Sequence, residues 1–182
     1  MLTFIAIKIQ YPDVMVAMTF AYHDAESQGA LDIIQQLTDS ENQQFRMEDF
    51  TLYQTSNGKL EMKLMADNVL SGDPGSSEYR LQGVHCSLYG EDNKKTLITG
   101  GEALYVAKQK LITIVDDVVV NANDGESTVE TDALRYYTFY KVAKTATPIV
   151  IKNERATIHG NSLMYNMKTG AFRVSGDVVC DL

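Results

Sequence analysis

Histidine, aspartate and glutamate side chains are the residue types in this chain that could bind a metal ion or carry acid–base catalysis. His23, His85 and His159 are isolated, and none has the neighbouring histidine or acid that a zinc site requires. Asp116 and Asp117 are adjacent, but no loop of repeated aspartates surrounds them as in a calcium site. We interpret the aspartate pair as a polar bend in a strand, and the pattern predicts no metal centre.

Nucleophile and phosphate-binding motifs are equally absent from the sequence. It contains no GxSxG, HExxH or P-loop pattern, and the Gly-Gly at 100–101 is interpreted as a bend rather than a phosphate cradle. Cys86 and Cys180 are far apart, so they could form one disulfide in an oxidising compartment or remain two buried thiols. The sequence therefore predicts a protein that is not an enzyme and needs no cofactor.

Composition narrows the class of protein further. With 182 residues, the chain is long enough for one domain with a sizeable core. Its net charge of −8 argues against nucleic acid as a partner, because phosphate backbones are bound by clustered Lys and Arg. The apolar stretch 1–22 is interrupted by Lys8, Pro12 and Asp13, so it predicts neither a membrane span nor a secretory signal.

Two regions differ in their residue patterns. In residues 24–38, apolar side chains recur at helical spacing, which predicts a short amphipathic helix or a linker. From Phe45 onward, apolar and polar residues alternate between turn signals such as Asn57-Gly58, which predicts half-buried strands. We therefore expect an N-terminal helical or irregular segment over 1–44 and an all-β domain over 45–182.

An internal repeat supports the all-β interpretation. Four times, a small residue and an acid or amide precede a strand, and a turn-like pair then leads into β-branched residues. The two landmarks of a unit lie 17, 16, 17 and 17 residues apart, measured from Asp67 to Val84, Glu102 to Val118, Asp132 to Ile149 and Asn161 to Val178. Each unit predicts two antiparallel strands with a turn, and such units must stack to bury a common apolar face.

The order of motifs resembles a known family. Residues 125–136 (GESTVETDALRY) are similar to a signature of the lipopolysaccharide-transport C component (LptC) family. The stretches 146–151, 158–165 and 174–178 are similar to the continuation of that signature, and the likeness extends over roughly 45–180. The resemblance implies a twisted, open β-jelly roll, here built from about four two-strand units.

The resemblance also implies a function for the apolar face. In this family it lines a trough that shields the acyl chains of lipopolysaccharide in the periplasm, whereas in most all-β proteins such a face is plain core. We expect the trough to be lined by Leu64, Val84, Leu104, Val106, Ile112, Ile114, Val118, Leu134, Tyr136, Ile149, Ile151, Leu163, Tyr165, Phe172 and Val174.

Partners follow from the same resemblance. The family accepts lipopolysaccharide from the inner-membrane ABC transporter and passes it to a soluble periplasmic jelly-roll bridge protein. The final strand, expected over 172–181, would dock that protein, or a second copy of this chain, through Phe172, Val174, Val178 and Val179. The family's transmembrane helix is not evident in 1–44, and nucleic acid is not an expected partner. A soluble A-type bridge component and a structural or adhesive β-repeat protein remain alternatives.

Overall fold

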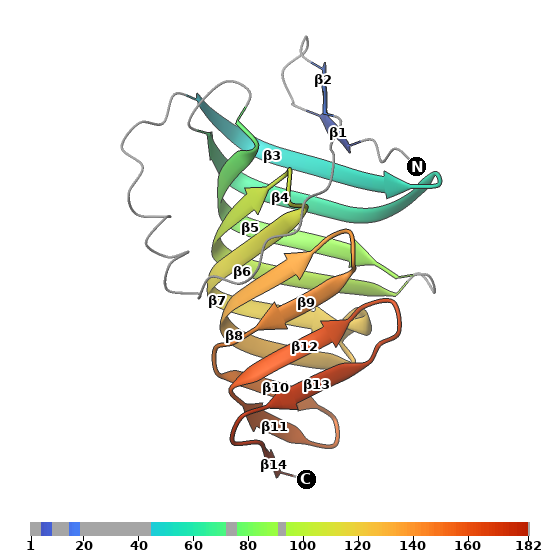
Figure 1. Cartoon of the computed structure of the whole chain (residues 1–182), viewed down its shortest axis with the longest axis vertical. Helices are drawn as coiled ribbons and strands as arrows, with labels where there is room; N and C mark the ends of the chain where they lie inside the picture. Colours follow the sequence, from blue (N-terminus) through green and yellow to red (C-terminus); the bar gives the residue numbers. More distant parts are fainter. Residues whose placement is uncertain (1–4, 9–14, 19–44, 72–75, 91–93, 182) are drawn as a thin grey trace.

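The computed structural model describes residues 5–8, 15–18, 45–71, 76–90 and 94–181. Within these ranges the chain is built of strands and one 3-10 turn, and the strands belong to a single 14-stranded sheet (Figure 1). Their bounds are β1 Ile5–Lys8, β2 Met15–Met18, β3 Phe45–Ser56, β4 Lys59–Ser71, β5 Glu78–Tyr89, β6 Lys95–Val106, β7 Leu111–Ala122, β8 Ser127–Tyr137, β9 Val142–Thr145, β10 Ile149–Asn153, β11 Thr157–Gly160, β12 Ser162–Asn166, β13 Phe172–Ser175 and β14 Val179–Asp181.

The sheet bends along a line into two walls. The strand pairs in the described part of the chain are all antiparallel. One end of β8, residues 135–137, pairs with β9, whereas residues 127–131 pair with β10. The first wall contains β9, β12 and β13 with residues 68–71, 78–82, 102–106, 111–115 and 133–137 of the long strands. The second wall contains β10, β11 and β14 with residues 62–65, 84–89, 95–99, 118–122 and 127–131.

Glycine and acidic residues form this bend line. Gly83 has φ +63°, and Asp116 and Asp117 have φ 64° and 51°, all in the left-handed region that a regular strand avoids. The β6–β7 and β7–β8 registers both shift by one residue after Val115, so the extra residue is on β7 at Asp116-Asp117, opposite Gly100 and Gly101 of β6. A bulge turns a strand and increases its local twist. Such positions on neighbouring strands therefore fold one sheet into a jelly roll, and the interpretation of Asp116-Asp117 as a bend is confirmed.

A different device separates β9 from β10. Pro148 has no backbone N–H, so the ladder is interrupted there. The hydroxyl of Thr147 lies 2.7 Å from those of Thr131 and Thr145, and the Thr131 hydroxyl donates to the Pro148 carbonyl at 3.0 Å. Thr131 and Thr145 are buried, and these bonds satisfy their hydroxyls at the bend line.

The sequence repeat corresponds to hairpins of the first wall. Each pair of landmarks brackets one hairpin, in which the chain leaves the bend line, turns and returns to it. The strands that follow Glu102, Asp132 and Asn161 are each the first strand of such a hairpin, so they occupy equivalent places. The predicted all-β jelly-roll class is confirmed, and the regular spacing reflects the distance between bends.

The N-terminal segment contains strands that the sequence patterns did not predict. β1 pairs with β2 and with residues 52–54 of β3, and so extends the sheet beyond β3. The helix or linker expected over 24–38 lies outside the described residues. The first long strand, β3, begins at Phe45.

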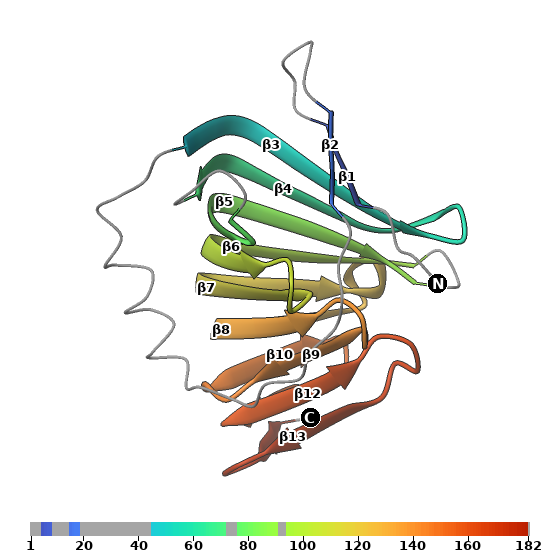
Figure 2. The ribbon, with the colours of Figure 1, turned by 45° about the horizontal axis from the view of Figure 1, so that its top comes forward.

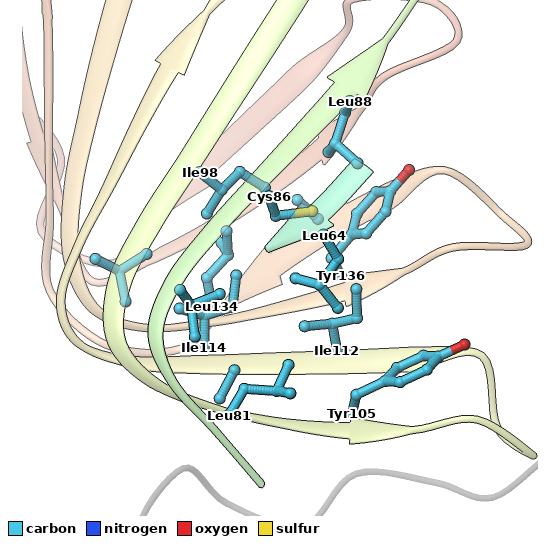
Figure 3. Close-up of a cluster of buried hydrophobic side chains, with 14 of the residues drawn as sticks. Leu64, Leu81, Cys86, Leu88, Ile98, Tyr105, Ile112, Ile114, Leu134 and Tyr136 are labelled. Atoms are coloured by element: carbon cyan, nitrogen blue, oxygen red, sulfur yellow. The ribbon is translucent and has the colours of Figure 1, made fainter. Parts of the chain in front are cut away.

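The core lies between the two walls. One cluster of buried apolar side chains includes Leu134 and Ile114 of the first wall together with Leu64 and Ile98 of the second. Figure 3 shows these side chains converging inside the curve of the sheet, with the Tyr105 and Tyr136 hydroxyls toward its open side. Figure 2 shows the ribbon of the walls from another direction.

Candidate functional site

Most of the predicted trough residues lie in the interior. Ten belong to the main buried cluster: Leu64, Val84, Ile112, Ile114, Val118, Leu134, Tyr136, Ile149, Ile151 and Leu163. Tyr165 and Val174 are half-buried and pack against that cluster. The structure therefore brings these side chains together, while their contact with lipid stays a prediction.

Leu104 and Val106 do not share this face. Ala103, Tyr105 and Ala107 occupy the main cluster instead, and Leu104 packs in a separate small cluster with Val115 and Ala133. The reason is the bend at Gly100-Gly101, across which the inward positions of β6 change from even to odd residue numbers, with Ile98 buried before the bend and Ala103 after it. The predicted alternation was extended unchanged through this bend, so the prediction of one shared face was wrong for Leu104. Val106 is buried outside both clusters.

Phe172 is placed on the expected face but is not buried. It lies opposite Tyr165 in the ladder, and cross-strand partners point to the same face of a sheet. Its side chain is nevertheless 57% exposed. Its strand, β13, pairs only with β12 among the described strands, so it is at an edge. Phe172 therefore lies on the predicted face but at an exposed edge of it, and its contact with lipid stays a prediction.

In its centre the interior is filled by side chains. Tyr136 of the first wall and Cys86 of the second belong to the same buried cluster and lie close together in Figure 3, so the two walls approach each other there. Burial, with smaller contributions from Cys86 and Glu61, raises the pKa of the Tyr136 hydroxyl above its ordinary value. Burial also raises the pKa of the Cys86 thiol to about 12. A ligand can enter this region only where the walls separate.

The interior opens to solvent at a pocket between the hairpin ends of the two walls. This cavity has a volume of about 340 Å³. It is lined by Leu88, Tyr89 and Lys94 among second-wall residues and by Tyr136, Tyr165 and Lys168 among first-wall residues. We call it the mouth pocket.

An ion pair joins the walls at this pocket. The Lys141 ammonium, in the turn between β8 and β9, donates to a Glu61 carboxylate oxygen of β4 at 2.7 Å. Their side chains are only 23% and 21% exposed. Sequence reasoning missed the pair because its partners are 80 residues apart and belong to no motif.

The C-terminal end of the roll presents open strand edges. Across the described strands, β13 pairs only with β12, and β14 only with β11. Phe172, Val178 and Val179 are each more than half exposed. The final strand predicted over 172–181 is split by Gly176 and Asp177, which have φ 78° and 47°. The prediction of one continuous edge strand was therefore wrong, and the edge consists of two short segments.

Comparison with known proteins identifies the family. Residues 14–180 match the model of the family described as "Lipopolysaccharide-assembly, LptC-related". The chain belongs to this LptC-related family.

One solved structure of similar fold is LptH, described as the LptA-homologous periplasmic component of the lipopolysaccharide transport device of Pseudomonas aeruginosa. The likeness has a TM-score of 0.53 at 13% identity and covers 66% of this chain and 94% of LptH. It extends the fold class to this chain. No curated protein matches the sequence.

The remaining chemical groups are placed apart from one another. Within the residues described, no three His, Cys, Asp or Glu side chains are grouped so that they could hold a metal ion. Both cysteines are free thiols; Cys86 is buried but Cys180 is exposed, so a pair of buried thiols is not what the fold contains. The same part of the chain has no helix with the length and hydropathy to cross a membrane.

Proposed function

We propose that this chain is a periplasmic bridge that carries lipopolysaccharide between the two membranes, without catalytic chemistry of its own. The observation that carries the proposal is the apolar interior between the walls, which continues to the exposed C-terminal edge. Membership of the LptC-related family and the jelly-roll fold support it.

The cost of exposing acyl chains to water explains why a lipid carrier requires such an interior. Moving an acyl chain from an apolar environment into water costs about 0.8 kcal/mol of free energy for each CH₂ group. A lipid with several chains therefore needs a continuous apolar path across an aqueous compartment. The interior side chains from Leu64 to Leu163 provide one, provided that the walls separate to admit the chains.

Direction is part of the proposal. The chain would accept lipopolysaccharide from the inner-membrane ABC transporter and pass it to the next jelly-roll protein at the C-terminal edge. The open edges of β13 and β14 support this direction, because unpaired backbone groups can add a strand from a partner. A second copy of this chain could use the same edge.

A photo-crosslinker at Leu163 tests the proposal. The matched control is the next residue, Met164, which is 45% exposed, whereas Leu163 is 6% exposed. Strand neighbours point to opposite faces, so only the inner position should crosslink lipopolysaccharide. Equal crosslinking at both positions, or none at Leu163, would reject the lipid-carrying interior.

The experiment also separates this proposal from the alternative of a structural β-repeat protein. Such a protein would bind partner strands but take up no lipid at Leu163. A soluble A-type bridge component would crosslink lipid as well. It would differ in not binding the inner-membrane transporter, which a pull-down with that transporter measures.

A further inference from the structure

We infer that the mouth pocket is an anion site that binds a phosphate group on the head of the lipid; this inference rests on the proposed function. The pocket is where the interior meets water, and two of its lining residues, Leu88 and Tyr136, also belong to the buried cluster. An amphiphile whose chains lie between the walls must place its polar head at this opening.

The charge of the pocket favours an anion. Among the described residues that line it, Lys94, Lys141 and Lys168 are basic and Glu61 is acidic. Within this described lining the basic side chains outnumber the acidic one, although the whole chain has a net charge of −8. Lysine binds phosphate as a point charge with three donors.

The lysines differ in what they already bind. Lys141 is held by Glu61 in the partly buried pair, whereas the Lys94–Glu126 pair is exposed, with side chains 42% and 61% exposed. An exposed ion pair is weak and can exchange for a better anion. Lys168, in the turn after β12, has an exposed side chain. Lys94 and Lys168 are therefore the two cations that we assign to the phosphate.

The size of the pocket sets the class of ligand. A volume of about 340 Å³ is at the lower end for small-molecule sites and fits a phosphorylated sugar rather than a lipid with several chains. The head group would bind at the mouth while the chains extend between the walls. Tyr89, Asn123 and Thr169 also line the pocket and supply neutral polar groups for sugar hydroxyls.

Two probe lipids that differ only in phosphate test the inference. The probes are a diphosphorylated lipid A glycolipid and the same glycolipid with both phosphates removed. Binding of each is measured for the wild type and for the double variant Lys94→Gln/Lys168→Gln. The matched control is Lys108→Gln/Lys152→Gln, which removes one exposed turn lysine and one lysine of an exposed ion pair outside the pocket.

The wild type and the control should bind the phosphorylated probe about tenfold more tightly than the other, and the pocket variant should lose this preference. Raising the salt from ~50 to ~500 mM should shrink the preference, because exposed charges are screened. Equal wild-type binding of both probes would overturn the anion site while the proposed function stood. A preference that survives in the pocket variant would also overturn it. Binding of neither probe would reject both.

Discussion

The Lys141 ammonium donates to the Glu61 carboxylate at 2.7 Å and thereby joins the two walls of the jelly roll at its open side. The bend line holds the walls together on the opposite side. The pair is about four-fifths buried, so water screens it less than it screens a surface pair. It is a polar link that must break if the walls separate fully at this point.

A double-mutant cycle on Glu61→Gln and Lys141→Gln measures the strength of this link. We expect a coupling of about 1–2 kcal/mol in the free energy of unfolding, because each single variant leaves a partly buried charge without its partner. Urea unfolding of the four proteins provides the values. The exposed Lys152–Glu130 pair, also at 2.7 Å, is the control and should couple by less than about 0.5 kcal/mol. Equal coupling in the two cycles would mean that the Glu61–Lys141 pair holds the walls together no more strongly than a surface ion pair stabilises the fold.

A charged substitution at Leu163 tests which face of β12 points into the core. Leu163→Asp should lower the free energy of unfolding by about 3 kcal/mol or more, because it buries a carboxylate among apolar side chains. Met164→Asp makes a similar change on the outer face, where the side chain is 45% exposed, and should cost less than about 1 kcal/mol. Chemical denaturation of both variants measures the difference. Similar losses at the two positions would contradict the assigned orientation of the strand.

The sequence predicted the strands and the repeat because the alternation of apolar and polar residues and the turn residues are visible within short segments. Leu134, Tyr136 and Leu163 follow their landmarks at the expected parity, and they are buried as expected. The prediction for Leu104 failed because the inward parity of β6 changes at the Gly100-Gly101 bend, and a glycine pair alone does not reveal with which parity the alternation resumes.

Long-range relations were not predictable from such patterns. The Glu61–Lys141 pair and the mouth pocket depend on how far the two walls approach, which is set by the whole core rather than by any segment. Phe172 has the parity of a core residue, but its burial depends on whether another strand covers β13. Alternation determines which face a side chain occupies and does not determine what lies over that face.

The bend line is tested at Gly100. A Cβ added there would collide with the Ile114 side chain and would lie 3.0 Å from the Val115 carbonyl oxygen, so Gly100→Ala requires the walls to shift. We expect a loss of about 1–3 kcal/mol in the free energy of unfolding, the usual range for overpacking. Gly58→Ala is the comparison, since no atom lies within 4 Å of its added Cβ and only its left-handed φ of +76° is strained. A smaller loss at Gly100 than at Gly58 would show that the bend has room for a side chain.

The C-terminal edge is tested by proline at Val174. The Asn166 amide donates to the Ala171 carbonyl at 2.8 Å, so alternation along β13 directs the Phe172 and Val174 amides to the open edge. Val174→Pro removes an outward donor and should weaken binding of the next jelly-roll protein about tenfold, with folding retained. Val174→Ala keeps the amide while it truncates the same side chain, and it should bind normally. Equal affinities of the two variants would exclude strand addition at β13.

The buried thiol of Cys86 predicts how stability changes with pH. Burial raises the pKa of Cys86 from its ordinary value of 9.0 to about 12, so the folded state retains a proton that the unfolded state loses. This contribution is complete below pH 9 and is lost as the pH rises toward 12, at about 1.4 kcal/mol per pH unit. Cys86→Ala should remove that slope, while the alkaline effects of the buried tyrosines remain in both proteins. Urea unfolding at pH 8, 9, 10 and 11 measures the two slopes. Parallel curves for the variant and the wild type would show that Cys86 is not the group responsible.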